Sequence, residues 1–330
     1  MDEIVVVGGG LLGCAVAWEL AKAGARVEVL ERAVPGAEAS SAAAGILAPR
    51  MEAHGREPMR ATGIESLGMY PGWVAELGAD VGFRVCGLVT AYADAPDRDA
   101  LRLADVREAD PLLAGGPGWW LPEEGVVDPR RLVTAVHAAA ARAGVRFRTG
   151  VEVSRVEADA VVLADGHIAR GRVVVCAGAW TGKVPGLARL PVRPVRGQIL
   201  ALEGAAPRGV VFGAGGYLVP RGDRVICGAT AEEVGFERGV TAGGILQILT
   251  SAVTMAPGLA GARFVEAWSG FRPGTPDDLP ILGEVDGVWV ASGHFRNGIL
   301  LAPVTARWMA DALLEGAPLP AAFGPGRFAG

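Results

Sequence analysis

The first thirty or so residues of the chain constrain its fold more than any other stretch. An apolar run at residues 4–7 meets the turn Gly8-Gly9-Gly10-Leu11-Leu12-Gly13, which has the spacing Gly-x-Gly-x-x-Gly. An amphipathic stretch at 14–23 and a second apolar run at 27–30 follow, and Glu31 comes next. This order predicts a strand, a tight turn, a helix and a second strand, as in a dinucleotide-binding fold.

Each glycine of the turn has its own predicted role. Gly8 permits the tight turn, Gly10 lets the backbone approach a pyrophosphate, and Gly13 lets the helix lie close on the strand. The helix N-terminus presents free N–H groups and a partial positive charge to the phosphates. Glu31 stands about 20 residues later, where a carboxylate can bind a ribose hydroxyl. An acidic residue at this place favours FAD or NAD over NADP, and a turn without phosphate is the alternative.

Composition limits the partners. A chain of 330 residues with 51% hydrophobic content can bury more than one core, so we expect two domains. The net charge of −5 and the absence of any Lys or Arg run argue against nucleic acid or an anionic membrane as a partner. The cysteines are widely spaced and form no C-x-x-C, which favours buried thiols in a reducing compartment. The first apolar stretch lacks a positively charged n-region, so we expect a cytoplasmic protein.

Small residues dominate the stretch 35–47, which follows Glu31 closely. They allow a backbone to run along a flat ligand, and Ser40 or Ser41 can cap a helix or donate to a phosphate. A flexible surface loop is the alternative interpretation, but the position after Glu31 favours the ligand.

The remaining chain alternates between two patterns. We expect a helix at 62–77, a strand at 83–92, a short helix at 106–112 and a strand at 118–122. The nucleotide-domain pattern resumes at Asp128, a predicted N-cap with Pro129 at the first position of a helix that ends at 143. Strands follow at 146–148, 151–156 and 160–163, and an apolar strand from 172 ends in small residues around Gly178, as expected beside a cofactor. Strand-like alternation at 192–240, a helix at 241–255, a strand at 288–292 and a helix reaching 314 complete the chain.

Two motifs near the end of the chain carry a specific resemblance. They are residues 268–275 (WSGFRPGT) and 293–303 (GHFRNGILLAP). With the glycine turn and residues 41–45 (SAAAG), they resemble the D-amino-acid oxidase superfamily of flavoproteins, and within it the chain is most similar to the glycine oxidases of thiazole biosynthesis.

The resemblance implies an α/β fold in two discontinuous domains. A Rossmann-type FAD-binding domain would comprise residues 1–82, 124–188 and 268–330, and a mostly antiparallel β substrate-binding domain would comprise 83–123 and 189–267. It further implies non-covalent FAD, oxidation of glycine to an imine that hydrolyses to glyoxylate and ammonia, reoxidation of the flavin by dioxygen to give hydrogen peroxide, a role in thiamine biosynthesis, and a homotetramer. Sarcosine, small D-amino acids or a larger amine stay open as substrates. So do a dehydrogenase with another electron acceptor and a flavin-binding scaffold without turnover.

The resemblance also assigns site residues, motif by motif. Arg272 and Tyr217 are implied to clamp the substrate carboxylate, and Arg296 is implied to be a further substrate-side residue. No catalytic side chain or metal is expected, because the flavin carries the electron chemistry. Expected cofactor contacts, besides Gly8, Gly10 and Gly13, are Leu11, Leu12, Glu31, Arg32, Ala39, Ser40, Ser41, Ala44, Gly45, Ile46, Val153 and Gly178, with a loop over the flavin ring made of His294, Phe295, Arg296, Asn297, Gly298, Ile299 and Leu300.

Structural roles compete with several of these assignments. Arg272 could instead pair with Asp277 or Asp278, and Tyr217 could be an ordinary core tyrosine. His294 could be a catalytic base, although a role in fixing the loop is favoured. Two other arginines, Arg193 and Arg196, are interpreted as structural ion-pair residues, and the segment 212–216 and the small Ala231 could widen the substrate pocket.

Overall fold

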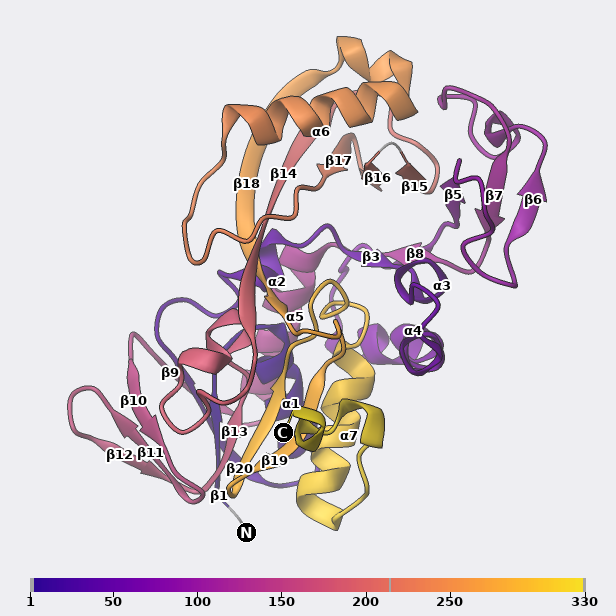
Figure 1. The fold of residues 1–330 in the computed structure, drawn as a ribbon. Coiled ribbons are helices and arrows are strands. Elements are labelled where there is room, and N and C mark those ends of the chain that lie inside the picture. Colours follow the sequence, from indigo (N-terminus) through magenta and orange to yellow (C-terminus); the bar gives the residue numbers. More distant parts are fainter. Residues whose placement is uncertain (1–2, 214, 329–330) are drawn as a thin grey trace.

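A six-stranded sheet forms the centre of the lower half of the molecule, in which both termini lie (Figure 1). The computed structural model describes residues 3–213 and 215–328. The strand order is β19-β20-β13-β1-β2-β9, and only β19 runs antiparallel to its neighbour. The predicted strand, turn, helix and strand at the start of the chain are confirmed as β1 (Glu3–Val7), α1 (Leu11–Lys22) and β2 (Arg26–Glu31). The other strands are β9 (Arg146–Thr149), β13 (Arg172–Val175), β19 (Ile281–Val285) and β20 (Val288–Ser292).

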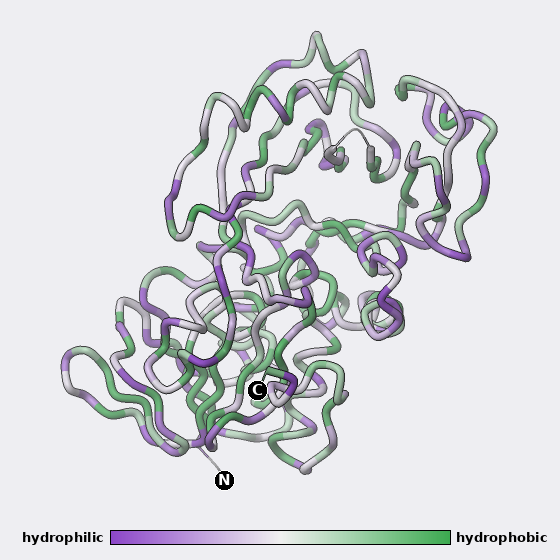
Figure 2. Tube along the Cα trace, in the orientation of Figure 1, coloured by the Kyte–Doolittle hydropathy of each residue, from purple (hydrophilic) through white to green (hydrophobic). Residues whose placement is uncertain are grey.

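Both faces of this sheet are covered, which explains why its strands are continuously apolar. Successive side chains of a strand point to opposite faces. Ile4 and Val6 pack in a core with helices α1, α4 (Glu57–Leu77), α5 (Pro129–Arg142) and α7 (Ala302–Glu315). Val5 and Val7 pack on the other face beside the small sheet β10 (Val153–Val156), β11 (Ala160–Leu163) and β12 (Ile168–Arg170). Figure 2 shows hydrophobic residues gathered along these central strands.

An eight-stranded, mostly antiparallel sheet forms the upper half (Figure 1), in the order β18-β14-β17-β16-β15-β5-β7-β6. Helix α6 (Ala242–Met255) covers one face, where Leu200, Leu218 and Ile248 are buried. The opposite face carries Ile199 and packs against the segment with α2 (Ala39–Ala42) and α3 (Pro49–Glu52). The strands are β5 (Leu88–Thr90), β6 (Leu101–Leu103), β7 (Gly118–Leu121), β14 (Arg193–Glu203), β15 (Val210–Gly213), β16 (Gly216–Arg221), β17 (Arg224–Gly228) and β18 (Arg263–Gly274).

A small sheet of β3 (Ile46–Leu47), β8 (Gly125–Val126) and β4 (Arg84–Val85) lies between the two halves. Five 3-10 helices occur in the described part of the chain: η1 (Val106–Glu108), η2 (Gly178–Lys183), η3 (Pro257–Gly261), η4 (Ala321–Phe323) and η5 (Pro325–Phe328). Among the helices of residues 3–213 and 215–328, none combines the length and the hydrophobicity needed to cross a membrane.

The structure corrects the predicted strand at 83–92. The chain breaks at Gly87, whose φ is +73°, and a Cβ there would overlap the ring of Trp120. The residues before the break pair with β8, whereas those after it pair with β7 and β15. One predicted strand is therefore two strands in two sheets.

The observed starts of the helices differ less from the predicted ones. Helix α4 starts at Glu57, ahead of the predicted start at 62, whereas Asp128 is the predicted N-cap of α5 and accepts a hydrogen bond from the Arg130 N–H at 2.9 Å. The proposed domain boundary between 267 and 268 falls inside β18, which pairs with β14 along its whole length. The two halves therefore share one continuous strand, and the division into domains stays a proposal.

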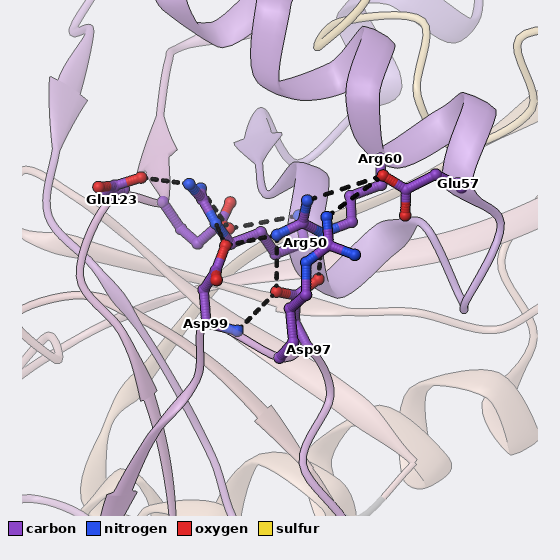
Figure 3. A network of polar contacts seen from close by, with 8 residues as sticks. Arg50, Glu57, Arg60, Asp97, Asp99 and Glu123 are labelled. Atoms are coloured by element: carbon purple, nitrogen blue, oxygen red, sulfur yellow. Dashed lines mark hydrogen bonds and ion pairs between the residues drawn. The ribbon is translucent and has the colours of Figure 1, made fainter.

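A polar network ties α3 and α4 to two turns of the upper half (Figure 3). Arg50 of α3 contacts Asp99, Glu123 and Glu124. Arg60 of α4 contacts Asp97 at 2.6 Å and also Asp99. The network fixes the position of the short helix α3, which is too short to be stable alone.

Candidate functional site

A cavity of about 610 Å³ lies between the carboxyl ends of the parallel strands and the inner face of the eight-stranded sheet. Its walls come from the β1–α1 turn, from β2, α2 and the segment after β13, and from β14, β16 and β18. Ligands of open α/β sheets bind outside the carboxyl ends of the strands. The cavity is therefore the candidate site.

The glycine turn forms the end of the cavity at the N-terminus of α1. Gly8 has φ +107°, and a Cβ there would lie 2.5 Å from the carbonyl oxygen of Cys176. Gly13 does not line the cavity, but a Cβ there would lie 1.9 Å from the Gly8 carbonyl oxygen, so it has the predicted packing role. The turn thus brings a helix N-terminus to the cavity, where the N–H groups and the helix dipole favour an anion.

Two side chains from later segments complete this end. The Glu31 carboxylate accepts hydrogen bonds from the N–H groups of Gly9 and Ala33, each at 2.8 Å. The Ser40 hydroxyl accepts from the Leu11 N–H at 2.9 Å. Both residues line the cavity. A helix N-terminus beside a hydroxyl, with a carboxylate at the end of the second strand, fits the pyrophosphate and ribose of FAD.

An aromatic and ionic cluster closes one side of the cavity. The Arg32 guanidinium lies 4.1 Å from the centre of the Trp180 ring and 3.1 Å from Glu38. Arg238, from the segment between β17 and α6, reaches Glu38 at 2.6 Å. This contact joins the upper half to α2. Trp180 was not predicted as a lining residue, although its place just after β13 was a signal.

Arg272 and Tyr217 lie together on the inner face of the upper sheet, and both line the cavity. The Arg272 guanidinium lies over Gly197, where a Cβ would be 2.3 Å from Nη1, and the Tyr217 ring lies over Gly228. Arg272 Nη1 donates to the Thr230 carbonyl at 3.0 Å. Burial raises the pKa of the Tyr217 phenol, although the charge of Arg272 opposes this, so the phenol stays protonated.

Arg272 has no ion-pair partner among residues 3–213 and 215–328. The two carboxylates weighed as partners are engaged elsewhere: Asp277 lies 2.7 Å from Arg327 and Asp278 lies 3.4 Å from Arg56. The salt-bridge alternative for Arg272 is therefore wrong. Tyr217 is half-buried, with its ring 5.7 Å from that of Phe212, and contributes to the cavity wall as well as to packing.

Arg296 differs from Arg272 because it is already paired. Its Nε donates to Glu52 Oε2 at 2.8 Å, and its Nη2 lies 2.6 Å from the same oxygen and also donates to His54 Nε2. Burial alone would raise the pKa of Glu52, but the contacts with His54 and Arg296 lower it overall. Glu52 lines the cavity, and the sequence carried no signal for this role.

His294 is a buried residue of the loop after β20. Its Nε2 lies 3.1 Å from the Thr305 hydroxyl, and burial lowers its pKa to about 4, so the ring is neutral at physiological pH. The loop is held from below by Tyr70 and Ser66, which donate to the carbonyls of Ile299 at 2.6 Å and Leu300 at 2.7 Å. These contacts support the loop-fixing interpretation of His294.

Most of the expected cofactor residues meet at the cavity. Four do not line it: Gly13 packs on Gly8, the Ser41 hydroxyl donates to the Gly36 carbonyl at 2.6 Å, and Asn297 and Leu300 are buried in the loop. Those that line it, together with Tyr217, Arg272 and Arg296, are Gly8, Gly10, Leu11, Leu12, Glu31, Arg32, Ala39, Ser40, Ala44, Gly45, Ile46, Val153, Gly178, His294, Phe295, Gly298 and Ile299.

The other arginine predictions are confirmed. Arg193 lies 3.0 Å from Glu233, and Arg196, with a side chain 5% exposed, pairs with Glu232. The predicted widening of the pocket at residues 212–216 includes Ala214, which lies outside the described residues.

Comparisons with known proteins place the chain in one family. The family model described as FAD dependent oxidoreductase, DAO, matches residues 3–312. The chain is 36% identical to the bifunctional protein ThiO/ThiG of Synechocystis sp., over 99% of this chain but 54% of that protein, so it spans about half the length of that relative. It is 33% identical to the glycine oxidase of Geobacillus kaustophilus, covering 94% of this chain and 92% of that one.

Solved structures agree. The crystal structure of glycine oxidase from Geobacillus kaustophilus has a TM-score of 0.91 and 31% identity, covering 99% of each chain. The crystal structure of iminodiacetate oxidase from Chelativorans sp. has a TM-score of 0.87 and 27% identity, covering 98% of this chain and 99% of that one. These likenesses confirm the predicted α/β fold. The chain belongs to the DAO family of FAD-dependent oxidoreductases.

Proposed function

We propose that this protein is an amino-acid oxidase that uses non-covalently bound FAD and dioxygen to deaminate glycine or a similarly small amine. The observation that carries the proposal is the unpaired guanidinium of Arg272, which faces the cavity beside a protonated Tyr217. The glycine oxidases among the relatives support the substrate class.

Arg272 supplies the carboxylate-binding group. Its planar fork can donate two parallel hydrogen bonds to a carboxylate, which a lysine cannot do. The Thr230 carbonyl at 3.0 Å holds the guanidinium in one orientation, and Gly197 leaves room for it. The Tyr217 phenol adds a neutral donor. Together these groups fix the carboxylate and so the direction of the substrate Cα–H bond, and orientation of this kind contributes up to about 7–11 kcal/mol in favourable cases.

The protons and electrons of the reaction can be accounted for without a catalytic side chain. The substrate ammonium first releases a proton to solvent. Bound FAD would supply the electron chemistry, as acceptor of the hydride from Cα and donor of both electrons to dioxygen, with hydrogen peroxide as the product. The resulting iminium loses a proton, and water hydrolyses the imine to glyoxylate and ammonia. His294 takes no part, because it is buried, neutral and bonded to Thr305.

Anaerobic reduction of the bound flavin tests the proposal. Glycine, sarcosine and D-alanine are added in turn to the FAD-loaded protein while the visible flavin absorbance is followed, and oxygen is then admitted with a peroxide assay. We expect bleaching by at least one of them and peroxide on reoxygenation. Bleaching without peroxide would indicate a dehydrogenase with another acceptor. No bleaching by any small amino acid would contradict the proposal.

The physiological role belongs to the same proposal. The ThiO/ThiG relatives support a place in thiamine biosynthesis, where this chain would correspond to about half of the bifunctional protein. The four cysteines are free, which suits the reducing cytoplasm. A homo-oligomer, as first expected from the resemblance, stays a prediction.

A further inference from the structure

Of the three guanidinium groups that line the cavity, those of Arg272 and Arg296 differ in charge balance. Arg272 contacts no carboxylate within residues 3–213 and 215–328, and its partners, the Thr230 carbonyl and the Tyr217 phenol, are neutral. Arg296 lies 2.6 Å from the Glu52 carboxylate. Of these two guanidinium groups, only that of Arg272 therefore keeps its positive charge for a substrate carboxylate.

Glu52 is held in place from two sides. Its side chain is 10% exposed, and its carboxylate contacts both Arg296 and His54. It ends helix α3, whose Arg50 N–H donates to the buried Glu124 at 3.3 Å and whose Arg50 side chain belongs to the network of Figure 3. Because the helix is anchored, the carboxylate stays beside Arg296 and cannot easily turn away.

A fixed carboxylate in a cavity selects against a second substrate carboxylate. One carboxylate can be bound by Arg272. Another on the same small molecule would meet Glu52, whose charge repels it, and would find the charge of Arg296 already neutralised. Specificity often rests on such a repulsive element as much as on the attractive one.

We infer that Glu52 is a specificity-determining residue which, by neutralising Arg296, restricts the substrate to amines with a single carboxylate and excludes dicarboxylic amines. The inference rests on the proposed function, because it takes Arg272 as the carboxylate clamp.

Binding of two inert ligands to the FAD-loaded protein tests this without turnover. Methoxyacetate and diglycolate are the ether analogues of sarcosine and iminodiacetate, and they carry one and two carboxylates. Their Kd values are measured by calorimetry. We expect the wild-type protein to bind methoxyacetate more tightly. In Glu52→Gln the ratio of the diglycolate Kd to the methoxyacetate Kd should fall about tenfold or more, since Arg296 is freed for the second carboxylate.

Two further variants control the measurement. Glu65→Gln removes the carboxylate of an exposed pair with Arg307, outside the cavity, and should leave the ratio unchanged. Adding Arg296→Gln to Glu52→Gln should abolish the gain in diglycolate binding.

Three outcomes would overturn the inference. The first is a wild-type protein that binds diglycolate as tightly as methoxyacetate, a result that does not depend on whether the variants fold. The second is a ratio of the diglycolate Kd to the methoxyacetate Kd in folded, flavin-containing Glu52→Gln that stays within twofold of wild type. This result would leave the proposed function intact. The third is a wild-type protein that binds neither ligand, or an Arg272→Ala variant that binds both ligands as tightly as wild type does. In that case the proposed function fails and the inference falls with it.

Discussion

Arg272 can serve as a clamp because of what its neighbours leave open. Gly197 provides space for the guanidinium, and the nearby carboxylates Asp277 and Asp278 are engaged by Arg327 and Arg56. Both carboxylates are therefore paired with other arginines and do not neutralise the Arg272 guanidinium. Charge balance around one side chain thus decides whether an arginine is structural, like Arg196, or available to a ligand.

Replacing Arg272 by alanine should weaken substrate binding while FAD is retained. A charge-assisted hydrogen bond contributes about 1.5–3 kcal/mol, so KM should rise by about 10- to 150-fold or more. Steady-state kinetics and the flavin-to-protein ratio measure the two effects. Arg193→Ala, at an exposed pair with Glu233, is the matched control and should change neither. An unchanged KM in Arg272→Ala would remove the clamp assignment.

Glu124 should make stability depend on pH. Its side chain is fully buried, and burial raises its pKa to about 8 despite the opposing charge of Arg50. The folded protein keeps a proton here that the unfolded chain loses above its usual pKa of 4.5. The stabilisation is therefore fully present below about pH 4.5 and is lost as pH rises through about 8.

The Glu124→Gln variant tests this contribution. Glutamine mimics the neutral acid, so the variant should lose less stability than wild type between pH 6 and pH 9, by a difference on the order of 1 kcal/mol or more. Urea unfolding of each protein at both pH values gives the change in its free energy of unfolding with pH. The same change in both proteins would show that Glu124 does not titrate in this range.

At the scale of elements, the close approach of α1 to β1 sets the position of the helix N-terminus. A Cβ at Gly13 would lie 1.9 Å from the Gly8 carbonyl oxygen, so the helix could not keep its place. The approach of α2 to β18 is comparable, since a Cβ at Gly270 would lie 2.4 Å from the Ala42 Cβ. Small residues in these stretches are thus explained by packing as well as by a ligand.

Gly13→Ala should therefore lower both thermal stability and FAD affinity, because the helix N-terminus must move away from the pyrophosphate site. Overpacking of this kind costs about 1–3 kcal/mol. Gly68→Ala is the control: it lies inside α4 with nothing within 4 Å of its Cβ position, and alanine should stabilise that helix slightly. Differential scanning calorimetry and FAD titration follow the two properties. Equal behaviour of both variants would mean that the close approach at Gly13 is unimportant.

At the scale of the whole molecule, the cavity lies between two halves that are joined by further polar contacts besides the network of Figure 3. Arg238 reaches Glu38, Arg130 reaches Glu266 at 3.1 Å, and Arg221 donates to the Ala44 carbonyl at 2.6 Å. A dinucleotide that contacts both halves would add to these contacts and hold the halves together.

Removal of FAD should lower the unfolding temperature of the protein. A ligand at 100 times its Kd stabilises the folded state by about 2.7 kcal/mol, so adding FAD back should restore Tm in a concentration-dependent way. Riboflavin, which lacks the pyrophosphate and adenosine, should restore much less at the same concentration, because it leaves the α1 N-terminus and Glu31 without a ligand. Equal stabilisation by the two compounds would argue against dinucleotide binding at that end of the cavity.

Much of the fold followed from the sequence because local patterns report local structure. The apolar run at residues 4–7, the turn with Gly8 and Gly13, and the cap at Asp128 all act within a few residues, through burial and hydrogen bonds. The resemblance then supplied Arg272 and Tyr217, and the structure places both on one cavity wall. Turn chemistry alone did not reveal the break at Gly87, because the ring that requires it, Trp120, belongs to another strand.

The charge balance of the cavity was decided by tertiary structure alone. Glu52 and Arg296 are 244 residues apart in sequence, and their pairing depends on how α3 and the loop after β20 pack. No periodicity or motif encodes which carboxylate an arginine will meet, since that choice is made by distance after folding. The sequence by itself determined a Rossmann-type fold and the residue types of the site. The tertiary structure decided that, among the described residues, Arg272 has no carboxylate partner whereas Arg296 has one, because Coulomb energy depends on separation in space and not along the chain.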